Sequence, residues 1–330
     1  SIDVQSFALQ EVSVGEDILG TACKARVTSS AMLAEERLKL LLKAERIDEV
    51  SGEVSVTLDF DGEAQILQLD LIVNEPEGGL VARALDLPGT PSLSLDVDGA
   101  GPLDALDIDI RLATENKERL TGRVSLIGDE TGRRFAADLA GDIRPLLHGE
   151  SQEFFGSQTT LSVAGRRAQS GAFDLSALNL RTQSLSLTGS ARVDADRTPE
   201  AFELDLLIVN ENGFSPVQLP GTTVNVTKAQ LNLDFDRTQS QAVSLAAEID
   251  RVVTEGIVIN ALKLMSNGVL SPSADTALTA QLSLEALGLN APNEAGITSA
   301  FGGDTRLTSN LTAQSFSEFS LQDLRLSGPN

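Results

Sequence analysis

Apolar and polar residues alternate with a period of two along most of this chain, and this alternation restricts the fold more than any other feature. The clearest stretch runs from Phe135 to Val193, where apolar residues such as Leu185 and Leu187 are separated by single polar residues. Successive side chains of a β-strand point to opposite faces of the sheet, so the pattern is typical of strands with one apolar and one polar face. The stretch predicts a long sheet of this kind.

Similar rows recur from Gly52 onward, about every 10 to 15 residues, with no long helical pattern between them, which favours antiparallel pairing over βαβ units. The stretch from Arg37 to Ile47 has high helix propensity as well as alternation, and we predict a strand there because its surroundings are strand-like. Two interruptions are predicted to be short helices, near residues 76–87 and 143–155. Pro76 suits the first turn of a helix, and apolar residues follow it at spacings of three and four.

About fifteen to twenty strands of this kind are too many for one flat sheet, because large twisted sheets curl, split or fold. A sandwich, a closed barrel and an elongated folded sheet are the available closures. We predict an all-β fold: an elongated, mostly antiparallel β-sheet folded along its length, with an apolar groove and one or two short inserted helices. Residues 1–330 are interpreted as one elongated fragment of a longer protein, with possible sub-units at 1–140 and 141–330.

A short internal repeat supports this elongated architecture. The string LIVNE occurs at residues 71–75 and again at 207–211, and LPGT follows at 87–90 and at 219–222. Both copies follow a predicted strand and precede the next one, so we interpret them as equivalent points of a repeated unit.

The composition disfavours several classes of function. The chain has 25 Lys+Arg against 48 Asp+Glu, a net charge of -23, which disfavours binding to nucleic acid. It has one cysteine, Cys23, and one histidine, His148, and it has no Trp or Tyr. Internal disulfides are therefore impossible. The chain also has almost none of the residues that histidine-based metal sites, histidine general bases and ring-stacking sugar sites require. We predict no metal site and no cofactor, and no apolar run is long enough for a membrane span.

An apolar groove that stays open could hold acyl chains, because each buried CH₂ contributes about 0.8 kcal/mol without any polar contact. The same rows could also form a closed core, and the sequence leaves both possibilities open. The candidate groove-lining residues come from the clearest alternating rows: Val54, Val56, Leu58, Leu69, Leu71, Ile108, Ile110, Leu161, Val163, Leu185, Leu187, Leu204 and Leu206. The candidate residues of groove-plugging helices are Leu80, Leu146, Leu147, Phe154 and Phe155.

Two stretches carry a resemblance to a known family. They are DLIVNEPEGGLVARALDLPGTPSLSLDVDGAGPLDALDIDIRLATENKERLTGRVSL and RFAADLAGDIRPLLHGESQEFFGSQTTLSVAGRRAQSGAFDLSALNLRTQSLSLTGSARV. Over about residues 50–210 the chain resembles the central β-repeat region of the TamB (translocation and assembly module) family, in the AsmA-like superfamily of Gram-negative bacteria. This family has no catalytic motif to carry over.

The resemblance implies a β-taco with an apolar groove, in a periplasmic protein anchored to the inner membrane by an N-terminal helix that is not present in this chain. It also implies an Omp85-class, TamA-like partner in the outer membrane, reached through regions outside this fragment. The implied function is to conduct phospholipid between the two membranes, to support outer-membrane protein assembly, or both.

Two other readings compete with a lipid-conducting bridge. A secreted or surface β-solenoid adhesin or structural domain with a closed core fits the acidic, Gly-rich composition, although the calcium-binding Gly-Gly-x-Gly-x-Asp repeat is missing. An enzyme could use two carboxylates on one strand face. The Asp-x-Asp pattern recurs too often for a single active site, which favours a solvated polar face, and we expect no enzymatic activity. The pairs are Asp96 with Asp98, Asp107 with Asp109, Asp194 with Asp196, and Asp234 with Asp236.

Overall fold

The computed structural model describes residues 2–16, 22–34, 36–48, 50–149, 151–271, 278–291, 303–313 and 318–328. Its strands form one antiparallel sheet in which nearly every strand pairs with the strands before and after it in the chain. Within the described residues, β1 pairs only with β2 and β21 only with β20, so the sheet is open. The predicted all-β, mostly antiparallel architecture is confirmed.

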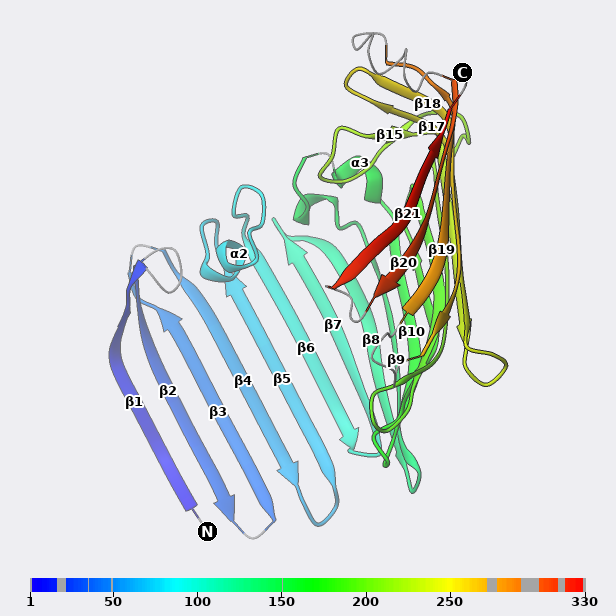
Figure 1. Cartoon of the computed structure of the whole chain (residues 1–330). Helices are drawn as coiled ribbons and strands as arrows, with labels where there is room; N and C mark the ends of the chain where they lie inside the picture. Colours follow the sequence, from blue (N-terminus) through cyan, green and yellow to red (C-terminus); the bar gives the residue numbers. More distant parts are fainter. Residues whose placement is uncertain are drawn as a thin grey trace. The chain divides into compact units, whose positions relative to one another are not determined.

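The chain divides into two compact units, residues 1–152 with 157–162, and residues 153–156 with 163–330. In the first unit, nine long strands form a meander, and α2 is inserted between β5 and β6 (Figure 1). The strands are β1 (Ile2–Val14), β2 (Cys23–Ala34), β3 (Arg37–Arg46), β4 (Gly52–Asp61), β5 (Ile66–Glu75), β6 (Leu93–Pro102), β7 (Ala105–Thr114), β8 (Lys117–Asp129) and β9 (Gly132–Gly141). The predicted strand from Arg37 is therefore correct, and it ends one residue early.

Strand β10 (Thr159–Ala168) begins in the first unit and continues in the second. The second unit is also a meander, except that β13 pairs with β16 because the two-residue strands β14 and β15 form a small hairpin between them. Its strands are β11 (Phe173–Arg181), β12 (Leu185–Val193), β13 (Pro199–Val209), β14 (Val217–Gln218), β15 (Asn225–Val226), β16 (Lys228–Asp236), β17 (Ala242–Thr254), β18 (Ile257–Leu270), β19 (Leu278–Leu289), β20 (Gly303–Ala313) and β21 (Phe319–Ser327).

The helices are shorter than the predicted ranges. The first, α2 (Leu80–Ala84), begins only after Gly79, because Gly78 has a φ of +79° that no helix allows. The second range contains two separate turns, the 3₁₀ turn η1 (Arg144–Leu146) and α3 (Ser151–Phe155). Gly149 lies between them with a φ of +25°, so the chain leaves the helical region there. The prediction of short inserted helices is correct, but the single helix from 143 to 155 is wrong.

A small buried cluster lies where α2 meets the ends of β5 and β6. Val73 and Leu93 of the sheet pack against Ala82 of α2 and Leu87 after it, and all four are buried. Leu146 of η1 packs against the same cluster. In the second unit, Phe235 is 1% exposed, and its ring centroid lies 5.1 Å from that of Phe202 on the paired strand β13.

The two LIVNE strings occupy similar places along their strands but opposite phases of the sheet. Leu71 pairs with Val56 and Val97 in an apolar row. Leu207, its counterpart in the string, pairs with Ser186 and Gln230 in a polar row. A shift of one residue in a strand moves every side chain to the other face, so the strings are not equivalent positions of a repeated unit.

Candidate functional site

Seven of the predicted lining residues lie on one face of the first unit. Val54, Val56 and Leu58 of β4 are directly opposite Val73, Leu71 and Leu69 of β5, respectively. The rows continue through β6 into β7, where Val97 pairs with Ile110 and Gly99 with Ile108. The register brings together residues from three strands that the sequence could only place one strand at a time. We call this surface the first apolar face.

A second apolar face crosses the strands of the other unit. Leu187 of β12 is opposite Leu206 of β13, and Leu206 is opposite Leu231 of β16. Leu185 pairs with Ile208, and Leu204 pairs with Gly189, so all four predicted residues of β12 and β13 share this face. The other two candidates, Leu161 and Val163, lie in β10 and are half-buried.

Most of these side chains are only half-buried, as expected for a sheet face shielded by its own neighbouring side chains. Toward the outer strands the apolar rows become exposed. Phe7 of β1 is 49% exposed and Leu33 of β2 is 46% exposed, while Phe319 and Leu326 of β21 are 66% and 52% exposed. Large apolar side chains exposed in a row are unusual on a monomeric protein and mark an interaction surface.

The total accessible surface supports the same conclusion. The chain exposes 19532 Å² for its 34.8 kDa. One compact monomer of this mass would expose about 13,000 Å², and two separate compact halves would expose about 15,700 Å². The excess over either value means that the chain encloses a smaller part of its surface than a compact protein of the same mass does.

The predicted plug residues have different roles. Leu80 is half-buried in α2, whereas the buried contacts of that segment come from Ala82 and Leu87. Leu146 packs on the buried cluster, and the carbonyl oxygen of Leu147 accepts a hydrogen bond from Gln152 Nε2 at 2.9 Å. The aromatic pair of α3 forms an edge-to-face contact with centroids 5.5 Å apart, and of the two rings Phe154 is buried and Phe155 half-buried.

The opposite faces of the sheet are polar and carry cross-strand ion pairs. Lys39 Nζ lies 2.7 Å from Asp59 Oδ2, and Arg37 Nη2 lies 2.6 Å from Asp61 Oδ2. These contacts join β3 to β4 directly across the sheet. The sequence predicted this polar face from alternation, but not which charges pair.

The Asp-x-Asp residues lie on these polar faces or in nearby turns. Asp109 accepts two hydrogen bonds from Arg123, at 2.9 and 3.2 Å. The hydrogen bond from the Arg123 guanidinium lowers the pKa of Asp109 from its ordinary value. The pKa of Asp236 is also lowered, chiefly by hydrogen bonds from Thr238. A catalytic acid needs a raised pKa, so these shifts run in the opposite direction.

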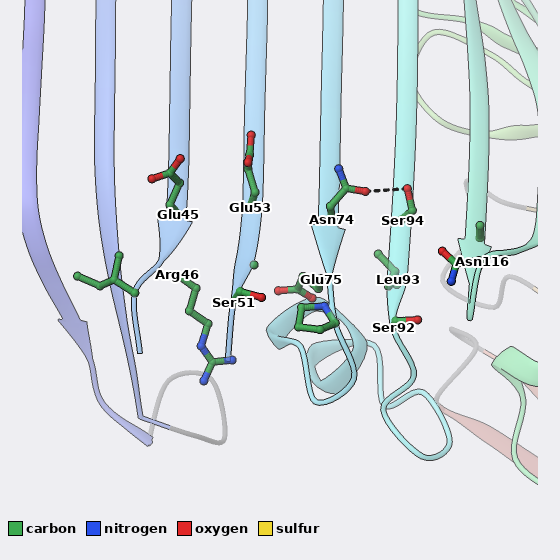
Figure 2. Close-up of a pocket in the computed structure, with 14 residues that line it drawn as sticks. Glu45, Arg46, Ser51, Glu53, Asn74, Glu75, Ser92, Leu93, Ser94 and Asn116 are labelled. Carbon is green, nitrogen blue, oxygen red and sulfur yellow. Dashed lines mark hydrogen bonds between the residues drawn. The ribbon is translucent and has the colours of Figure 1, made fainter. Parts of the chain in front are cut away.

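A pocket of about 520 Å³ lies at the ends of β3 to β7 (Figure 2). Its lining includes a polar row across four strands, formed by Glu45, Glu53, Asn74 and Ser94. Ser94 Oγ donates to Asn74 Oδ1 at 2.9 Å (Figure 2), and Lys43 Nζ bridges the two glutamates at 2.7 and 3.3 Å. Within the described chain, no group of three or more His, Cys, Asp or Glu side chains is arranged to hold a metal ion.

Arg46 is a residue of interest that the sequence argument missed. It follows Leu40, Leu42 and Ala44 at a spacing of two and therefore falls in the apolar phase of β3. Its side chain is 9% exposed, and its Nη1 is buried with no hydrogen-bond partner in the described parts of the chain. The signal that could have found it is a charged residue in phase with an apolar row.

The described residues include no helix with both the length and the apolar character to cross a bilayer. Comparison of the chain with protein-family models, with curated protein sequences and with solved structures found no match. The candidate site is therefore defined by geometry alone: two apolar sheet faces, only partly covered, each backed by a polar face.

Proposed function

We propose that the two apolar faces bind the acyl chains of phospholipids. The observation that carries this proposal is the incomplete cover of the apolar rows, which end in exposed residues such as Phe7 and Phe319. An acyl chain lying on such a row contributes about 0.8 kcal/mol for each CH₂ removed from water, so binding needs no polar contact along the chain. A closed-core adhesin or structural domain would enclose these rows, and the large accessible surface argues against it.

In the cell, the proposed role is that of a segment of a bridge across the periplasm. Such a segment conducts phospholipid between the inner and outer membranes, or supports outer-membrane protein assembly by shielding apolar strands, or does both. The proposal for this setting, including anchorage in the inner membrane and an Omp85-class outer-membrane partner, rests on the resemblance to the TamB family. No catalytic step is involved, and no cofactor or nucleic acid takes part.

The test is native mass spectrometry of the purified chain, combined with lipid extraction. The chain offers a closely matched pair of substitutions, because Leu206 and Leu207 are neighbours on β13 and face opposite sides of the sheet. Leu206→Asp places a carboxylate among Leu187 and Leu231, whereas Leu207→Asp places the same group between Ser186 and Gln230.

The wild-type chain and Leu207→Asp should retain phospholipid near stoichiometry, and Leu206→Asp should lose most of it while keeping its β-sheet circular dichroism spectrum. A wild-type chain that is folded and free of lipid, even after incubation with phospholipid vesicles, would overturn the proposal. Equal lipid loss in both variants would also contradict it, because binding would then not depend on the apolar face.

A further inference from the structure

Arg46 stands at the end of the first apolar face. The register places it opposite Ala25 of β2 and Gly52 of β4, in the row next to the one that pairs Ala44 with Val54. It is the last residue of β3, so the apolar row of this strand ends in a guanidinium. Gly52 lies between Arg46 and Glu75, because a Cβ placed on it would contact Arg46 Cβ at 3.7 Å and Glu75 Cγ at 3.6 Å, and all three residues line the pocket of about 520 Å³.

The guanidinium of Arg46 is only partly paired. Its Nε donates to Asp48 Oδ1 at 2.6 Å, and Nη1 is buried and donates to none of the described residues. The Asp48 carboxylate also accepts two other hydrogen bonds. Its Oδ1 accepts from the backbone N–H of Val50 at 3.2 Å, and its Oδ2 accepts from the backbone N–H of Lys24 at 3.1 Å. An unpaired donor on a buried charged group is unfavourable, so its presence needs an explanation, such as an ordered water, an ion or a functional role.

The other nearby carboxylates that the structure describes do not supply a partner for Arg46 Nη1. Glu75 lies at the end of β5 in the same phase of the sheet, but its two oxygens accept from the N–H groups of Leu80 and Val81 at 2.9 and 2.7 Å. Glu45 and Glu53 occupy the opposite phase, where both pair with Lys43. Among the described residues, the first apolar face therefore ends in a cation with an unused donor, and Glu45, Glu53 and Glu75 are bound to other groups.

We propose that Arg46 binds the phosphate of a phospholipid whose acyl chains lie on the first apolar face. The inference rests on the proposed function and deepens it, because it places the headgroup at the Arg46 end of the strands. A guanidinium matches phosphate oxygens with paired N–H donors. Since Nη1 has no acceptor among the residues that the structure describes, its pairing with a phosphate oxygen breaks no hydrogen bond seen there.

The test compares two short-chain amphiphiles below their aggregation concentrations, using isothermal titration calorimetry. Dihexanoyl phosphatidylcholine carries the phosphate with no net charge, and dihexanoylglycerol has the same chains without it. The wild-type chain should bind the phosphate-bearing lipid at least about tenfold more tightly, as expected for one hydrogen bond to a charged group. Arg46→Gln should bind both lipids equally. Arg111→Gln, at an exposed arginine on the polar face of β7, makes the same charge change and should keep the preference.

Each outcome decides a different point. If the wild-type chain binds both lipids equally, or if Arg46→Gln keeps the preference, the headgroup assignment is overturned while lipid binding stands. If neither lipid binds, the proposed function fails as well. If inorganic phosphate alone displaces dihexanoyl phosphatidylcholine at comparable concentration, Arg46 binds a free anion, and its assignment to a phospholipid headgroup is wrong. The wild-type comparison needs no variant, so it remains decisive if Arg46→Gln does not fold.

Discussion

At the scale of single residues, the side chain of Glu75 caps the N-terminus of α2. This helix has five residues and no capping side chain at Gly79, so its first N–H groups depend on the carboxylate of Glu75 five and six positions earlier. Glu75→Ala should lower the free energy of unfolding by about 2–4 kcal/mol, because two hydrogen bonds to a buried charged group are lost. Urea unfolding followed by circular dichroism measures the change.

The control for this substitution is Glu77→Ala. Glu77 is exposed and lies only two residues away, so its removal should change the free energy of unfolding by no more than about 0.5 kcal/mol. Equal losses in the two variants would mean that the carboxylate of Glu75 does not hold α2 in place.

Glu75 and Arg46 also show how far single residues can be understood from the sequence. Alternation alone assigns each of them to the apolar phase of its strand, because Val73 and Ala44 precede them by two residues. Their partners depend on chain segments that the alternation does not predict, namely the turn that brings α2 back to β5 and the turn at Asp48. Spacing along the strand gives the face, and only the folded turns give the burial and the hydrogen bonds.

At the scale of elements, the turn between β12 and β13 is tied to the end of β16. Arg237 Nη2 lies 2.7 Å from Asp194 Oδ2 and 3.4 Å from Glu200 Oε1. A hydrogen bond with Asp196, followed by the one from Arg237, lowers the pKa of Asp194 from 3.8 to about 2. A depressed pKa in the folded state means that the stabilisation is present above the ordinary pKa and is lost as the pH falls toward 2.

This linkage predicts how Asp194→Asn behaves with pH. The variant should be less stable than the wild type at about pH 6, and the difference should shrink between about pH 4 and pH 2, where wild-type Asp194 takes up a proton. Urea midpoints across this range measure the effect. Asp174→Asn, at an exposed carboxylate of β11, should show no such change. A difference between Asp194→Asn and wild type that is independent of pH would contradict the linkage.

A glycine in β8 sets how closely β8 and β9 approach. Gly122 pairs with Leu139, and a Cβ at this position would collide with the backbone oxygen of Asp138 and the side chain of Leu139. Gly122→Ala should therefore destabilise the first unit by about 1–3 kcal/mol through forced backbone shifts. Gly52→Ala is the matched control, since a Cβ there meets its nearest atoms at 3.6 Å or more. A tolerated Gly122→Ala in thermal unfolding would mean that the strands separate easily at this point.

Strands were far more predictable than the helical insertions, for a physical reason. A strand such as β4 shows its period over ten residues, and each added residue repeats the same signal. The helical segments are five residues or shorter, so they show little more than one turn, and backbone conformations at Gly78 and Gly149 decide where they begin and end. The interpretation of the LIVNE strings as a repeat was wrong, because two identical short sequences can lie with opposite faces of their strands toward the apolar side of the sheet.

At the scale of the whole molecule, exposed apolar rows coexist with a net charge of -23. Apolar faces of separate copies would bury surface against each other, which favours association. Like charges on the polar faces oppose it, and that repulsion reaches over the Debye length of the solution. The register places the apolar rows and the charged residues on opposite sides of the sheet in each unit, so attraction and repulsion can be varied independently, by substitution and by salt.

This balance predicts association that increases with salt. Raising the ionic strength from about 0.05 M to about 0.5 M shortens the Debye length from about 14 Å to about 4 Å and removes most of the repulsion between copies. Light scattering should then show a mass that rises above 34.8 kDa with salt and with protein concentration. Leu206→Asp, which charges the second apolar face, should suppress this rise more than Leu207→Asp on the polar face. A mass that stays monomeric in lipid-free protein at every salt concentration would mean that the apolar rows are enclosed, and the proposal of acyl-chain binding would then fail with this prediction.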